Sequence, residues 1–122
     1  MTGLDRKQKK VYAWVETRLG KLNQNKKERA LRFLEESLEL VQTIGVTESD
    51  IFAVLAHVYS KPQGETAQEI GGVGVTLLAL SEATGISFDW ALEREITRIH
   101  TSSPKKFRDR QDQNVKLGIG LS

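Results

Sequence analysis

The sequence contains no cysteine, one methionine and only two prolines among its 122 residues. Without cysteine the chain can form neither a disulfide nor a thiolate metal site. No apolar run reaches the roughly 18 residues that a membrane-spanning helix needs, and no apolar stretch follows the basic N-terminus as in a secretory signal. We therefore expect a cytoplasmic protein that has no membrane partner.

Charge of one sign does not dominate the chain either, since the formal net charge is +2. Basic residues collect at the two ends, in residues 1–10 and 104–116, so the stretch between them is net acidic. A nucleic-acid-binding domain would instead cluster its positive charge on one folded face. We therefore expect no nucleic acid partner, and a small nucleic-acid-associated helical protein is the least favoured alternative.

Apolar residues recur at helical spacing along most of the chain, without a convincing strand or an internal repeat. A chain of this size can bury roughly two thirds of its unfolded surface, which is enough for one core. The spacing predicts an all-α bundle of about five helices, in residues 4–19, 26–44, 47–58, 65–84 and 87–100. We expect residues 1–103 to form one domain and residues 104–122 to form a basic, flexible extension with a short helix near residues 105–113.

Several expected helix ends carry capping residues. Thr47 and Asp50 have the spacing of a capping box, with Asp in place of the usual Glu or Gln. Ser87 is placed to cap the last helix of the domain, and Gly45 and Gly85 are placed to end the helices that precede them.

Three carboxylates share one side of the expected helix 26–44. At about 100° per residue, Glu39 lies about 40° from Glu35, and Glu36 lies about 100° from it, next to the apolar side. Carboxylates held together repel one another, and a hard cation such as Mg²⁺ would relieve this repulsion and bridge to phosphates. Arg32 lies in the same arc and offers a simpler alternative, because it could pair with Glu35 and Glu36.

A second acidic pair, Glu65 and Glu69, has the i, i+4 spacing of one helix face. Gly72 occupies the next position of that row, in the stretch QEIGGVGVTLLAL. Each glycine inside a helix costs about 1 kcal/mol relative to alanine. The stretch has neither the GxGxxG pattern nor the lysine of a P-loop and follows no strand, so we do not expect a phosphate-binding loop. Tight helix packing is the expected reason for Gly74.

These residues resemble the MazG-like all-α nucleoside triphosphate pyrophosphohydrolases, over roughly residues 26–99. The family motif EExxE is matched by Glu35, Glu36 and Glu39. The second motif, ExxD, is matched by Glu69 alone, because Gly72 stands where the family has aspartate. Residues 85–95 are also similar to the segment that follows this motif in the family.

The resemblance implies a helical bundle completed by assembly into a homodimer or homotetramer. It also implies that the protein cleaves nucleoside triphosphates between the α and β phosphates with Mg²⁺, or alternatively Mn²⁺. The implied metal ligands are Glu35, Glu36, Glu39 and Glu69, with Glu65 as an auxiliary ligand. Glu36 would also position the attacking water, and we expect the phosphates to contact Lys105, Lys106 and Arg108.

The missing carboxylate at Gly72 leaves a second hypothesis open. The chain could be a non-catalytic or weakly active module on the MazG-like scaffold, which binds nucleotides or only assembles. The small residues near Gly72 would then allow close contact between helices of different copies.

Overall fold

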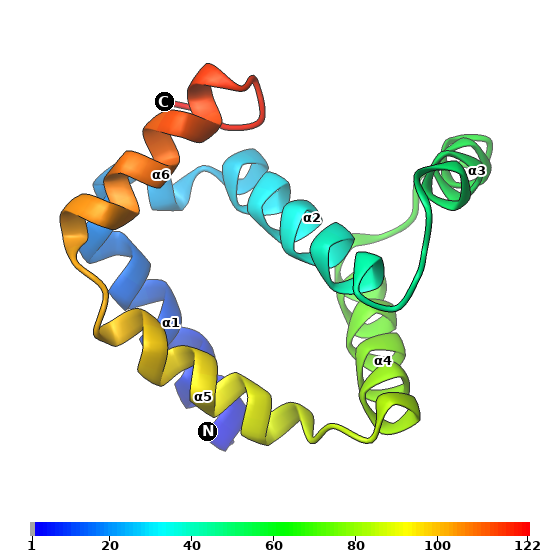
Figure 1. Ribbon diagram of the computed structural model, residues 1–122, viewed down its shortest axis with the longest axis horizontal. Coiled ribbons are helices and arrows are strands. Elements are labelled where there is room, and N and C mark those ends of the chain that lie inside the picture. The colour runs from blue at the N-terminus through cyan, green and yellow to red at the C-terminus, as the bar shows by residue number, and fades with distance from the viewer. Residues whose placement is uncertain (1) are drawn as a thin grey trace. The chain divides into compact units, whose positions relative to one another are not determined.

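The computed structural model describes residues 2–122, and its regular structure is entirely helical in that range (Figure 1). The elements are α1 (Gly3–Leu19), the 3-10 helix η1 (Gly20–Gln24), α2 (Lys26–Gln42), α3 (Glu48–Tyr59), α4 (Thr66–Thr84), α5 (Phe88–His100) and α6 (Pro104–Lys116). The predicted all-α class is confirmed. Residues 2–122 contain six α-helices rather than about five, because α6 is a full helix.

Local caps explain most of the helix ends. At the start of α3, Thr47 and Asp50 form the predicted capping box, in which each side chain accepts from the backbone N–H of the other. Gly85 ends α4 in the left-handed conformation with φ of 72°, as expected. Ser103 caps α6 by accepting a hydrogen bond from the backbone N–H of Lys106. The next residue is Pro104, whose missing N–H costs nothing, because the N–H groups of the first helical turn have no partner within the helix.

Helix α4 begins one residue later than the predicted helix 65–84. Glu65 has an extended backbone and caps α4, because its two carboxylate oxygens accept hydrogen bonds from the backbone of Ala67 at 3.0 Å and of Gln68 at 2.9 Å. Its side chain therefore serves the helix end, and it does not continue the face that carries Glu69.

The chain divides into two compact units, residues 2–44 with 100–122 and Gly45–Ile99. In the first unit the apolar centre is Trp14, the one hydrophobic residue among residues 2–122 that is buried. Phe107 of α6 meets the Trp14 ring edge-on at 5.3 Å between ring centroids, and His100 lies at 5.7 Å. The Phe107 contact joins α6 to α1. The boundary expected between residues 103 and 104 stays a prediction.

Polar side chains form the rest of the interior of the first unit. The buried polar residues of the described chain are Asn23, Glu28, Gln111 and Asn114. Asn23 donates from Nδ2 to the carbonyl oxygen of Tyr12 at 2.9 Å, which fixes η1 against α1. Hydrogen bonds between distant segments therefore hold this unit together along with the Trp14 contacts.

The second unit, Gly45–Ile99, contains no buried residue. Large apolar side chains on α3 are mostly exposed, including Phe52 at 63% and Tyr59 at 82%. The same holds for Ile70 at 68% on α4 and for Trp90 at 56% on α5. A helix gains most of its stability in water by burying its apolar face, and these faces are not buried within the second unit.

Among residues 2–122, no single helix is both long and apolar enough to cross a membrane. Taken together, α4 and α5 have the length and composition, but the pair is bent by 101° at the break between them.

Candidate functional site

The acidic triplet of the sequence lies on one unbroken helix. Asn25 starts α2 by accepting from the backbone N–H of Glu28 at 3.0 Å, and the helix continues past the triplet to Gln42. Glu36 and Glu39 are exposed, whereas Glu35 is partly covered. The helix thus presents three carboxylates along one arc, as the spacing predicted.

The simpler alternative for this arc, pairing with Arg32, is present at Glu35. Arg32 donates from Nη1 to Glu35 Oε1 at 2.9 Å. The Nε of Arg32 lies 3.2 Å from Glu28 Oε1, one turn earlier on α2. One guanidinium therefore serves two carboxylates, and a cation bound at Glu35 would have to compete with it.

Glu28 was not singled out by the sequence patterns, although its side chain is fully buried. Its carboxylate accepts from Gln111 Nε2 at 2.7 Å and from the backbone N–H of Leu121 at 2.6 Å. Arg29 Nη2 lies 3.8 Å from Glu28 Oε1. Burial lowers the pKa of Arg29, and the negative charge of Glu28 partly offsets this effect. No local pattern marks Glu28, because its hydrogen-bond donors lie far along the chain.

Glu65 and Glu69, the acids of the second motif region, have different roles at the start of α4. The backbone N–H groups of Ala67 and then Gln68 lower the pKa of Glu65, because they stabilise its charged form. Glu69 packs against Gly64, where an added Cβ would lie 2.5 Å from Glu69 Oε1. Glu69 is therefore the acid of this pair whose carboxylate is not used as the helix cap.

Glu69 also lines a pocket of about 690 Å³ within the second unit. The other lining residues are Val58, Tyr59, Lys61, Pro62, Gln63 and Gly64. They come from the end of α3 and the loop before α4, so the pocket combines one carboxylate with one ammonium group and an exposed aromatic ring. A polar ligand could reach Glu69 from this side.

The glycines of α4 have open surroundings. A Cβ added at Gly71, Gly72 or Gly74 would meet no atom within 4 Å in the described chain. The tight packing expected for Gly74 is therefore not found within residues 2–122. An aspartate at Gly72 would have room for its side chain.

The three basic residues expected at the phosphates differ in their surroundings. Lys105 donates to Asp109 Oδ2 at 2.9 Å, and this hydrogen bond is the largest reason why the pKa of Lys105 is raised. Arg108 lines a pocket of about 670 Å³ in the first unit, whereas Lys105 and Lys106 do not line it. The structure thus does not bring the three side chains into one pocket.

The donor chemistry of these acids fits Mg²⁺, which prefers carboxylate oxygens. Glu35, Glu36 and Glu39 belong to the first unit, and Glu65 and Glu69 belong to the second. Within residues 2–122 no three His, Asp or Glu side chains are gathered so that they could hold a metal ion. The metal site stays a prediction, and it would require ligands from more than one helix.

No family model, curated protein or solved structure matches this chain. The resemblance to the MazG-like proteins therefore stays a prediction from the motif residues.

Proposed function

We propose that the protein is a Mg²⁺-dependent nucleoside triphosphate pyrophosphohydrolase, which converts a (d)NTP to a (d)NMP and pyrophosphate. The observation that supports this proposal is the acidic arc of α2. Glu35, Glu36 and Glu39 occupy one regular helix, and two of the three are exposed. An all-oxygen donor set of this kind suits Mg²⁺ or Mn²⁺ together with a phosphate chain.

The residues of the chain take distinct roles in this proposal. Glu35, Glu36, Glu39 and Glu69 are the ligands, and Glu36 also orients the attacking water. When bound, the metal supplies positive charge next to the phosphates and lowers the pKa of water. Water is needed as the nucleophile, because hydrolysis between the α and β phosphates adds one water molecule to the two products.

The acids near Gly72 limit how the site can be completed. Glu65 could replace the missing aspartate only by giving up its hydrogen bonds to the start of α4. Glu69 does not cap α4, so we assign it as the ligand from α4 and keep Glu65 as the auxiliary residue.

A second candidate function is a self-assembling helical module without catalysis. The exposed apolar side chains of α3 and α4 favour it, because apolar patches of that kind usually mark interaction surfaces. A homodimer or homotetramer would cover these faces and is part of both candidate functions. Assembly alone therefore does not separate the two.

Pyrophosphate release separates them. The wild-type chain should release pyrophosphate from at least one member of a panel of NTPs and dNTPs when Mg²⁺ or Mn²⁺ is present. Glu39→Gln should lower kcat at least about tenfold, whereas Glu82→Gln, an exposed acid of α4 outside the motifs, should not change it. If no nucleotide is hydrolysed and sedimentation shows a stable oligomer, the assembly module is the better description.

A further inference from the structure

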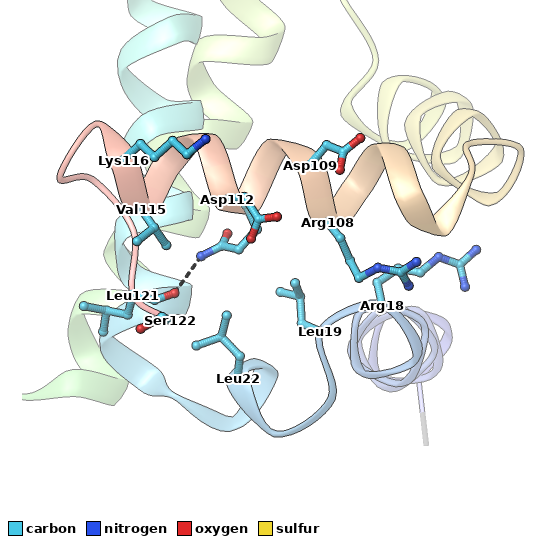
Figure 2. Close-up of a pocket in the computed structure, with 11 residues that line it drawn as sticks. Arg18, Leu19, Leu22, Arg108, Asp109, Asp112, Val115, Lys116, Leu121 and Ser122 are labelled. Atoms are coloured by element: carbon cyan, nitrogen blue, oxygen red, sulfur yellow. Dashed lines mark hydrogen bonds between the residues drawn. The ribbon is translucent and has the colours of Figure 1, made fainter.

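A second pocket, separate from the proposed metal ligands of α2 and α4, lies within the first unit (Figure 2). Its volume is about 670 Å³, inside the range of roughly 300–1,000 Å³ that is typical of small-molecule sites. Its lining comes from the end of α1, from η1, from α6 and from the C-terminal residues: Arg18, Leu19, Leu22, Arg108, Asp109, Gln111, Asp112, Val115, Lys116, Leu121 and Ser122.

One part of this lining is apolar. Leu19, Leu22, Val115 and Leu121 come from four different segments and together form an apolar floor. Leu121 is held in place at both backbone groups: its N–H donates to Glu28 Oε2 at 2.6 Å, and its carbonyl oxygen accepts from Gln111 Nε2 at 2.9 Å, the dashed line in Figure 2. The C-terminal wall of the pocket is thus fixed by the buried carboxylate.

Two arginines lie at one end of the pocket, where Figure 2 shows Arg18 of α1 and Arg108 of α6 extending toward the same side. The Arg18 guanidinium is oriented by its neighbours, because it stacks 4.6 Å from the centroid of the Trp14 ring and donates from Nη1 to Thr17 Oγ1 at 2.8 Å. Its Nε is buried and has no hydrogen-bond partner within the described residues.

The charge of the pocket favours an anion at this end. Its lining has three cationic side chains, Arg18, Arg108 and Lys116, and two carboxylates, Asp109 and Asp112. Asp109 is already neutralised from outside the pocket by Lys105 at 2.9 Å. Positive charge is therefore left over, and the planar guanidinium groups match the oxygens of a carboxylate or a phosphate.

We propose that this pocket binds a small organic anion with an apolar body. Its carboxylate or phosphate oxygens lie between Arg18 and Arg108, and its apolar part lies on the floor formed by Leu19, Leu22, Val115 and Leu121. The site uses none of the proposed metal ligands of α2 and α4, so it stands whether or not the chain hydrolyses nucleotides.

Calorimetry on the full chain tests the proposal with four probes: decanoate, decyl phosphate, decanol and inorganic phosphate. The two decyl anions are kept below their micelle-forming concentrations, and decanol is kept below its solubility limit. The two decyl anions should bind, and the tighter of them identifies the head group. Decanol and inorganic phosphate should each bind at least about tenfold more weakly, since each lacks one half of the ligand. Equal binding of decanol and decanoate, or no binding of either decyl anion, would overturn the proposal.

A matched pair of variants on α6 locates the bound anion. Arg108→Gln should weaken binding of the preferred decyl anion about tenfold, the effect of losing one charge-assisted hydrogen bond. Arg110→Gln removes the same charge from an exposed position outside the pocket and should leave binding within about twofold. Val115→Gln should also weaken binding, because it replaces an apolar side chain of the floor with a polar one. Equal effects of the two arginine variants would show that the anion binds elsewhere.

Discussion

Glu28 and Gln111 lie 83 positions apart in the chain, yet Gln111 Nε2 donates a buried hydrogen bond of 2.7 Å to Glu28 Oε1. The same carboxylate accepts from the backbone of Leu121, 93 positions away. These bonds tie the start of α2 to α6 and to the residues after it. A buried carboxylate is stable only when such donors surround it.

Replacing Glu28 by glutamine should therefore destabilise the first unit. The amide keeps one acceptor oxygen for one of these two donors, but its NH2 group then faces the other donor, Gln111 Nε2 or the Leu121 N–H, and cannot accept from it. We expect the free energy of unfolding in urea to fall by about 3 kcal/mol. Glu16→Gln, at an exposed position of α1, should change it by less than about 0.5 kcal/mol. Similar losses in the two variants would count against the buried network.

Mild acid should loosen the starts of α3 and α4. Hydrogen bonds from Thr47 stabilise the charged form of Asp50 and lower its pKa from the usual 3.8. Hydrogen bonds from the backbone of Ala67 and Gln68 lower the pKa of Glu65 from the usual 4.5 in the same way. Since both folded pKa values lie below the unfolded ones, the stabilisation is fully present above the unfolded values. It is lost as the pH falls through the folded values.

Far-ultraviolet circular dichroism can follow the helix content as the pH is lowered. The loss of helix should occur below about pH 4.5, and it should be smaller in Asp50→Asn and Glu65→Gln than in the wild type. Glu82→Gln, which alters no cap, should titrate like the wild type. A wild-type profile retained in both cap variants would rule out these caps as its cause.

An aspartate at Gly72 should be tolerated and should strengthen the acidic site. No atom lies within 4 Å of an added Cβ at Gly72, and aspartate is a slightly better helix former than glycine. We expect Gly72→Asp to keep or raise thermal stability and to tighten Mg²⁺ binding at least about threefold, as measured by calorimetry. The control is Gly74→Asp, which also has room but lies off the row of Glu69 and should not tighten binding. Equal gains in both would indicate a general effect of charge.

Gly64 should position Glu69. An alanine Cβ at Gly64 would lie 2.5 Å from Glu69 Oε1, so the flexible carboxylate has to move. Because the backbone of Gly64 is not left-handed, Gly64→Ala should change the free energy of unfolding by less than about 1 kcal/mol. It should nevertheless lower the rate of pyrophosphate release, whereas Gly3→Ala, which meets open space, should not. An unchanged rate in Gly64→Ala would argue against Glu69 as a ligand.

The sequence predicted the features of the fold that depend on neighbouring residues. Thr47 with Asp50, and Gly85, act within one turn, so their patterns identified helix ends that the structure contains. The start of α4 was misplaced by one residue, because a helical wheel does not distinguish a capping Glu65 from a helical one.

Interactions between distant segments could not be predicted in this way. Glu28 reads as an ordinary acid near a helix start, and only the fold brings Gln111 and Leu121 to it. Apolar periodicity likewise predicted buried faces on α3 and α4, but it cannot say what covers them. The pairing of Arg32 with Glu35 could be predicted from the sequence, because the two residues are three positions apart on one helix.

The most direct test of the proposed activity is to identify its products. Phosphorus NMR can do this on a nucleoside triphosphate incubated with the chain and Mg²⁺. A nucleoside monophosphate and pyrophosphate should appear in equal amounts, and neither should form when Mg²⁺ is chelated. Release of a nucleoside diphosphate with inorganic phosphate, or no turnover of any nucleotide in the panel, would contradict the proposal.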